Sequence, residues 1–210
     1  MRLRASLQLA AVMLILVAYS LASHYSTSHP QAHDLGAILA LAPMLTVALL
    51  LIWRWTGAPQ AVLTAAAAAF LLKLYWPLFA ENFTAVYLLQ ECGFYAIMAA
   101  GFGFSLRTGR VPLCTQLADK VHGPLSVPEL RYTRGVTVAW VVFFLLNMAV
   151  MLLLFEFAPL RVWSLFVNFC SIPLILLMFA AEYAVRRLAL PARPRGGLMA
   201  TLRVYFANQP

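Results

Sequence analysis

Four polar residues lie inside apolar stretches of this sequence: Lys73, Glu91, Asn147 and Asn168. A charged side chain within a membrane-spanning helix normally pairs with an opposite charge, contacts water or belongs to a functional site. The chemistry open to these residues is therefore charge pairing, hydrogen bonding between helices, or recognition of the polar end of a lipid-like molecule.

Lys73 and Glu91 lie on either side of a short polar turn at Ala80-Glu81-Asn82, which would join two helices into a hairpin. At about 1.5 Å per residue, both lie roughly 10–14 Å from this turn, so their depths match. We predict a buried contact between the two side chains. This contact would either lock the two helices together or line a polar cavity that binds a headgroup or a substrate.

Asn147 and Asn168 lie on either side of a second turn, around Pro159, at a depth of roughly 12–15 Å. One interpretation is an interhelical hydrogen bond, which typically contributes about 0.6 kcal/mol. The other is a single polar layer, shared with Lys73 and Glu91, in the outer half of a helix bundle. Pro173 would kink the chain beside this layer, because it cannot donate a hydrogen bond to residue 169.

The composition indicates that lipid surrounds these residues. The chain is 63% hydrophobic and only 10% charged, whereas globular domains are about 25% charged. Most of its apolar runs approach or exceed the ~20 residues that a helix needs to cross a bilayer, and only helices or closed barrels can span one. We therefore expect an all-α, polytopic bundle that forms a single membrane domain over residues 1–210. Its six transmembrane helices are predicted at about 7–21, 35–53, 61–79, 83–104, 136–157 and 160–184.

The distribution of basic residues predicts the orientation of the bundle. With the N-terminus inside, every Lys and Arg except Lys73 and Arg161 lies on the inner side. Cytoplasmic segments carry the excess of Lys and Arg in membrane proteins. We expect both termini to be cytoplasmic. Residues 7–21 also fit a cleavable signal peptide, with an A-x-A-like site at Ser20-Leu21-Ala22, although we favour a first span.

Two inner segments fall outside the predicted spans: a cytoplasmic loop at 105–135 and a basic tail at 185–210. Leucine and valine at positions 113, 117 and 121 predict a short amphipathic helix over 112–121 on the inner leaflet. Pro124 and Pro128 are expected to break the chain before the next span.

The loop carries a basic face that could dock an acidic protein partner by charge, although positive-inside topology alone would also explain it. Its residues are Arg107, Arg110, Lys120, Arg131 and Arg134. The net charge of +8 is thus interpreted as topology and contact with anionic membrane lipids, and no nucleic-acid binding is expected. Glu182 and Arg186, four residues apart, are predicted to form a surface ion pair.

No catalytic residue and no cofactor are predicted. The segment Ser23–Asp34 reads as a polar outer loop that holds His24, His29, His33 and Asp34, but this spacing matches no defined metal site, so none is assigned. The three cysteines lack a C-x-x-C spacing and support neither a disulfide framework nor zinc. Phosphate-binding loops and hydrolase or metalloprotease motifs do not occur.

A series of motifs over about residues 105–190 carries a resemblance to a known family. The motifs are Leu106-Arg107-x-Gly109-Arg110-x-Pro112-Leu113, His122-Gly123-Pro124-Leu125, Tyr132-Thr133-Arg134-x-Val136-Thr137, Ala139-Trp140, Phe143-Phe144, Trp163-Ser164-Leu165-Phe166-x-Asn168 and Glu182-Tyr183. They resemble a family of uncharacterised bacterial membrane proteins associated with gene clusters for aryl polyene, xanthomonadin-like pigments. The first four spans agree with that family only in hydropathy.

The resemblance implies a pathway rather than a reaction. It implies an inner-membrane protein that assists assembly or export of an aryl polyene-type lipid, as a non-catalytic scaffold for biosynthesis on a carrier protein. Partners would then be acyl carrier protein or enzymes of a polyketide or fatty-acid type synthase. The alternatives are a small lipid or pigment transporter, or flippase, and a membrane-embedded acyl-transfer enzyme. Neither the substrate nor the oligomeric state follows from the sequence.

Overall fold

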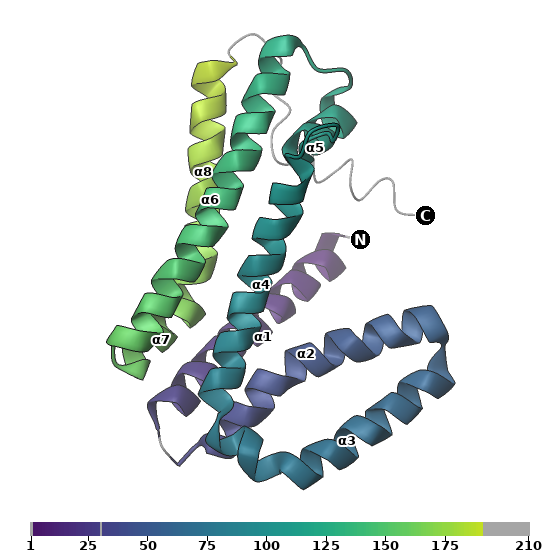
Figure 1. The fold of residues 1–210 in the computed structure, drawn as a ribbon, viewed down its shortest axis with the longest axis vertical. Coiled ribbons are helices and arrows are strands. Elements are labelled where there is room, and N and C mark those ends of the chain that lie inside the picture. Colours follow the sequence, from purple (N-terminus) through teal and green to yellow (C-terminus); the bar gives the residue numbers. More distant parts are fainter. Residues whose placement is uncertain (1, 30, 191–210) are drawn as a thin grey trace. The chain divides into compact units, whose positions relative to one another are not determined.

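The computed structural model describes residues 2–29 and 31–190, and these residues form an all-α structure (Figure 1). Six helices in this part of the chain are long and apolar enough to cross a membrane, which confirms the predicted fold class. In chain order the elements are α1 (Arg2–Ser28), α2 (His33–Thr56), α3 (Ala58–Glu81), α4 (Phe83–Ser105), α5 (Leu113–His122), α6 (Val127–Phe157), α7 (Leu160–Leu165), the π-helical turn η1 (Phe166–Cys170) and α8 (Ser171–Ala189). Most of the basic tail lies outside the described residues.

Short turns join the spanning helices. Gly57 separates α2 from α3 with a φ of 92°, a backbone conformation that favours glycine. Asn82 separates α3 from α4, and its side-chain amide donates to the carbonyl oxygen of Leu78 at 2.9 Å. Pro159 precedes α7. The last two turns are the ones that the sequence predicts.

The segment that was predicted to be a polar outer loop differs from the prediction, because α1 continues through Ser28 and α2 already begins at His33. The predicted polar loop is therefore mostly helix. Ser26 and Thr27 donate their hydroxyls to the carbonyl oxygen of Ser23 at 2.9 and 2.7 Å. Such bonds to the preceding turn allow hydroxyl side chains to stay within a helix.

The predicted break at Pro128 is also wrong, because α6 begins at Val127 and includes this proline. The Glu129 carboxylate accepts hydrogen bonds from the backbone N–H and the hydroxyl of Ser126, at 2.8 and 2.7 Å. This Ser-x-x-Glu arrangement caps the start of a helix. Proline is tolerated in the first turn, where its missing N–H has no intrahelical partner.

Contacts divide the described chain into two compact units. Unit 1 comprises the residues up to Gly93 together with Met151–Ser171, and unit 2 comprises Phe94–Val150 and the residues from Ile172 onward. In unit 1, α2 and α3 form a hairpin (Figure 1). Ala37, Ala80 and Phe83 form a buried core there, with Trp76 packed against them.

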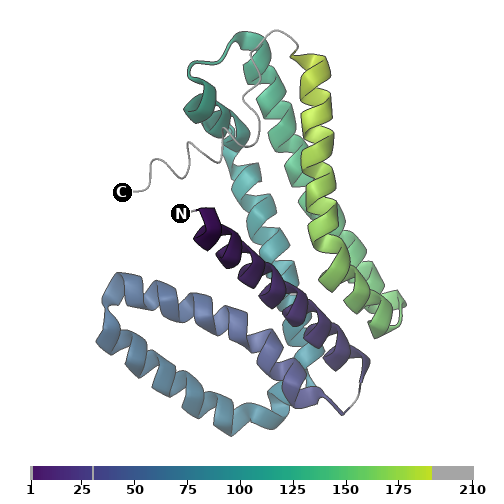
Figure 2. The ribbon, with the colours of Figure 1, turned by 180° about the vertical axis from the view of Figure 1, so that it is seen from behind.

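Unit 2 is built from the second half of α4, α5, most of α6, and α8. Helices α6 and α8 run alongside each other in both ribbon views (Figure 2). Trp140 lies at the centre of this unit, with its ring 5.5 Å from Phe144 and 4.9 Å from Phe179. Phe102 of α4 packs against Phe144 at 5.5 Å. The aromatic rings therefore join three helices.

Candidate functional sites

The structure separates the two charged residues that the sequence pairs. Among the described side chains, Lys73 and Glu91 form no ion pair. Lys73 is exposed on α3, and Glu91 is partly buried on α4. The predicted buried contact between them is therefore not present, and Glu91 has other neighbours.

A chain of polar contacts within unit 1 links α4, η1, α7 and α1. Tyr87 donates its hydroxyl to Oδ1 of Asn168 at 2.7 Å. Asn168 donates from Nδ2 to the carbonyl oxygen and the hydroxyl of Ser164, at 2.9 and 3.1 Å. The Ser164 hydroxyl also lies 3.1 Å from Nδ1 of His24. Asn168 thus makes an interhelical hydrogen bond, and its partner is Tyr87.

Glu91 lies beside this chain of contacts. It is close enough to Tyr19 and Tyr87 to interact electrostatically with both phenol groups. Ser23 is within side-chain hydrogen-bonding reach of both phenols, although its buried hydroxyl and the buried Oε1 of Gln90 make no hydrogen bond of ordinary length and angle. We call Tyr19, Ser23, Tyr87, Gln90, Glu91 and Asn168 the intramembrane polar cluster.

Asn147, the fourth residue of the predicted polar layer, belongs to unit 2. Its side chain is buried, and Nδ2 donates to the carbonyl oxygen of Phe143 on its own helix at 2.8 Å. Of the four residues that the sequence singles out, Glu91 and Asn168 share Tyr87 as a neighbour.

Tyr87 and Ser164 were not predicted as site residues, although the sequence carries a signal for both. Tyr87 precedes Glu91 by four residues, and Ser164 precedes Asn168 by four. Residues four apart lie on the same face of a helix. A polar residue four positions before Glu91 or Asn168 is therefore a candidate member of the same site.

The histidines between Ser23 and Asp34 each have a partner of their own. His29 stacks on Tyr25 with ring centroids 4.1 Å apart, and Nδ1 of His33 lies 3.3 Å from the carbonyl oxygen of Ala80. The Asp34 carboxylate accepts a hydrogen bond from the indole N–H of Trp76 at 2.7 Å. No three His, Cys, Asp or Glu residues come together as a metal site within residues 2–29 and 31–190.

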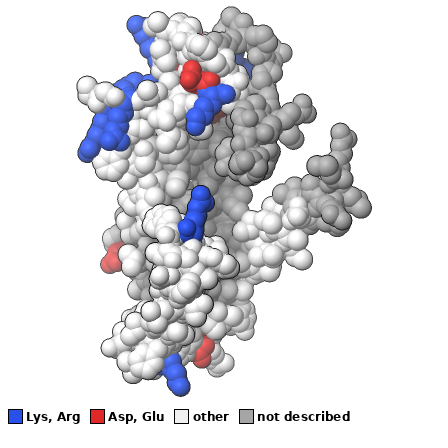
Figure 3. Space-filling view, turned by 90° about the vertical axis from the view of Figure 1, so that its right-hand side faces the viewer, with Lys and Arg blue, Asp and Glu red and all other residues white. Residues whose placement is uncertain are grey.

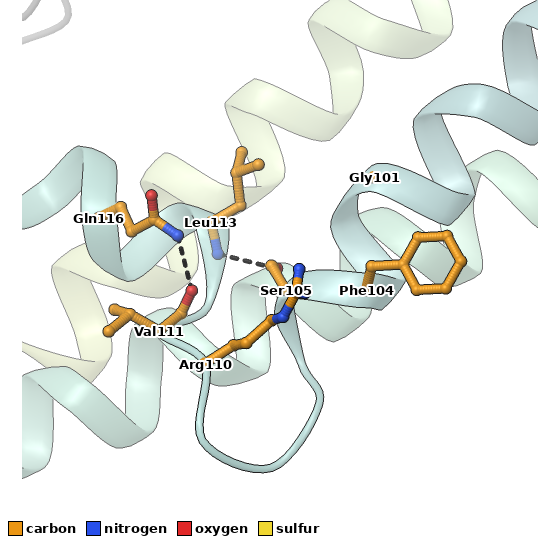
Figure 4. A pocket seen from close by; sticks show the side chains of 7 residues that line it. All are labelled: Gly101, Phe104, Ser105, Arg110, Val111, Leu113 and Gln116. Atoms are coloured by element: carbon orange, nitrogen blue, oxygen red, sulfur yellow. Dashed lines mark hydrogen bonds between the residues drawn. The ribbon is translucent and has the colours of Figure 1, made fainter.

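In unit 2, three of the predicted basic residues surround one hollow. This hollow has a volume of about 360 Å³, and Arg110, Arg131 and Arg134 line it together with Thr115 of α5 and apolar side chains of α6 and of the segment before α5. A second hollow of about 560 Å³ shares Arg110 and reaches Phe104 of α4 (Figure 4). Among the residues that the structure describes, no carboxylate lines either hollow.

The other two basic residues of the predicted face line neither hollow. Arg107 places its guanidinium 4.5 Å from the ring centre of Phe104, and Lys120 lies exposed on α5. Figure 3 shows Lys and Arg side chains gathered at the upper end of the view, where Figure 1 places α5.

Hydroxyl groups hold α5, the predicted amphipathic helix, against α4 and α6. Thr115 and Thr133 share a hydrogen bond of 2.7 Å. The backbone N–H of Cys114 donates to the hydroxyl of Thr137 at 3.3 Å, and that of Leu113 donates to Ser105 at 3.0 Å. These contacts fix one wall of both hollows.

The predicted ion pair between Glu182 and Arg186 is replaced by contacts to other helices. Tyr132 of α6 donates its hydroxyl to Glu182, with 3.1 Å to Oε1. Nη2 of Arg186 lies 2.8 Å from Nε2 of His122 at the end of α5. Because arginine only donates hydrogen bonds, Nε2 of His122 accepts this one.

Comparison with known proteins gives no relative for this chain: no protein-family model, curated protein or solved structure matches it.

Proposed function

We propose that this multi-pass membrane protein assists assembly or export of an aryl polyene-type lipid in the bacterial inner membrane. In this proposal it acts as a non-catalytic scaffold for biosynthesis on an acyl carrier protein. The motif series between residues 105 and 190 supports the pathway. The basic face on unit 2 supports the scaffold role.

The observation that carries the scaffold role is the hollow between α5 and α6. Arg110, Arg131 and Arg134 line it, and none of the described residues around it supplies a carboxylate. The nearby Glu129 is buried, and its carboxylate accepts bonds from Ser126. Uncompensated positive charge of this kind favours association with an acidic partner and increases its rate of encounter.

Several motif residues also build the wall behind this face. Thr133 and Thr137 hold α5, and Tyr132 connects α6 to Glu182 of α8. A scaffold needs such a rigid support, because a docking surface that orders only on binding loses affinity to the entropy of ordering.

The test is complementation of a gene deletion in a pigment-producing host. The deletion strain should lose membrane-bound polyene, and the wild-type gene should restore it. A variant with Arg110→Gln, Arg131→Gln and Arg134→Gln should not restore it at equal protein abundance. Arg54→Gln is the matched control, because Arg54 lies in the last turn of α2 in unit 1. Unchanged pigment after deletion would contradict the pathway.

A transporter or flippase is the second candidate, and the intramembrane polar cluster is the observation that favours it. In the deletion strain, polyene that is made but retained in the inner membrane would support transport over scaffolding.

An acyl-transfer enzyme receives less support. His24 and Ser164 form a base–nucleophile contact. However, Ser164 is fully buried, and its hydroxyl accepts a hydrogen bond from Asn168, so a substrate cannot reach it in this arrangement.

A further inference from the structure

Glu91 is an acidic side chain within a candidate membrane-spanning helix, and it forms no ion pair with any cationic side chain that the structure describes. It lies in the middle of α4 and is partly buried. Lys73, the basic residue that the sequence places at a matching depth, is exposed and forms no ion pair with it. A carboxylate at such a depth costs several kcal/mol unless it is neutralised. The neutralising charge must then come from a bound proton or another cation.

The surroundings of Glu91 are rich in oxygen atoms, several of which have free hydrogen-bonding capacity. The hydroxyls of Tyr19 and Tyr87 donate to Leu39 and Asn168, so their lone pairs stay free to accept. The Ser23 hydroxyl is buried, with 2% of the residue exposed; it is near both phenols but makes no hydrogen bond of ordinary length and angle. The Gln90 side-chain oxygen is likewise buried without a hydrogen bond.

Unsatisfied polar atoms of this kind are uncommon in folded proteins and call for a ligand, an ion or water. These two belong to the same cluster as Glu91, because both lie next to Tyr19. Carboxylate, hydroxyl and amide oxygens are the ligands of hard cations. The π-helical turn η1, which carries Asn168 into the cluster, is a distortion that is frequent at functional sites.

We propose that the intramembrane polar cluster binds an exchangeable monovalent cation, H⁺ or Na⁺, at the carboxyl group of Glu91. The titratable and charged groups near this site are Tyr19 and His24 on α1, Tyr87 and Cys92 on α4, and Arg161 on α7. None of these groups forms an ion pair with Glu91 in this structure. The inference is independent of the docking face on unit 2.

The experiment is carbodiimide labelling of the full chain in lipid nanodiscs, read out by peptide mass spectrometry. Dicyclohexylcarbodiimide reacts with protonated carboxyl groups in apolar surroundings. We expect selective labelling of Glu91 at about pH 6. At pH values above the pKa of this carboxyl group, the labelling rate should decrease by about tenfold for each further pH unit, because only the protonated form reacts.

Two exposed carboxylates at helix ends, Glu81 and Glu156, serve as internal controls. Glu91→Gln should abolish the label while the protein keeps its elution volume in size-exclusion chromatography. Tyr19→Phe should keep the label but shift its pH midpoint, because the phenol hydroxyl would no longer stabilise one charge state of Glu91.

The two cations are distinguished by adding Na⁺ in place of choline at constant pH. Protection of Glu91 by Na⁺ would identify a sodium site. Labelling that depends on pH but not on Na⁺ would identify a proton site. Labelling of Glu91 that is no faster than that of Glu156, or that does not change with pH, would overturn the proposal.

Discussion

The protonation state of Cys114 depends on the groups that surround its thiol. Burial raises the pKa of the Cys114 thiol; a hydrogen bond with Thr137 acts in the opposite direction, and the charge of Glu182 raises the pKa further. The neutral thiol is therefore the form that the fold favours. Low thiolate content makes this cysteine a poor nucleophile.

We predict that the alkylation rate of Cys114 by iodoacetamide rises at higher pH in the folded protein than in the unfolded chain. The thiol of the unfolded chain titrates at about pH 8.5. The contribution of Cys114 to stability is fully present below that pH and is lost as the pH rises through the higher folded-state pKa. Rates are measured against pH in mild detergent and in SDS. Identical midpoints in the two states would contradict the prediction.

Individual side chains were also where sequence reasoning was weakest. Glu91 and Asn168 stand out because each interrupts an apolar run. Depth along a helix could be calculated, but the direction in which each side chain points could not. As a result, Lys73 matched Glu91 in depth, whereas the neighbours that the structure gives Glu91 are tyrosines.

At the scale of elements, the close approach of α2 to the start of α4 depends on Gly36. A Cβ atom added at Gly36 would collide with the ring of Phe83, which is buried in unit 1. The ring also packs against His33 with centroids 5.8 Å apart. Phe83 therefore has little freedom to move away.

We predict that Gly36→Ala destabilises the protein by about 1–3 kcal/mol, the usual effect of overpacking a core. Gly93→Ala is the matched control, because a Cβ there meets nothing within 4 Å. Alanine at this helical position should instead stabilise by up to about 1 kcal/mol. Unfolding of both variants in SDS, followed by circular dichroism, measures the difference. Equal effects of the two substitutions would show that Gly36 is not tightly packed.

Helices as such were predictable because lipid leaves the backbone few alternatives, whereas their ends were not. Hydropathy places the end of α1 near Leu21, but Ser26 and Thr27 bond to the backbone of the preceding turn and extend the helix. Similarly, Pro128 signals a break, but its place in the first turn of α6 makes it compatible with the helix. Local hydrogen bonds decide such boundaries.

At the scale of the whole molecule, six candidate spans would place both termini on the same side of a membrane. The basic residues predict that this side is the cytoplasm. We expect an impermeant maleimide to label Ala158→Cys, between α6 and α7, in intact spheroplasts. Thr108→Cys, between α4 and α5, should react only after permeabilisation. Both substitutions are made in a chain without its native cysteines, and the reverse pattern would refute the orientation.

The exposure of α3 has a consequence for how the protein reaches the membrane. None of the residues in its most apolar 18-residue window is buried in the structure. A helix without a buried residue in this window partitions into the bilayer largely on its own hydropathy. Lys73 opposes that step, since a lysine at the centre of a helix costs about 2.5–3.5 kcal/mol on a translocon scale. Its long stem can carry the ammonium group towards the interface. Insertion of α3 during synthesis therefore depends on the apolar residues of its own sequence, which must offset the cost of Lys73.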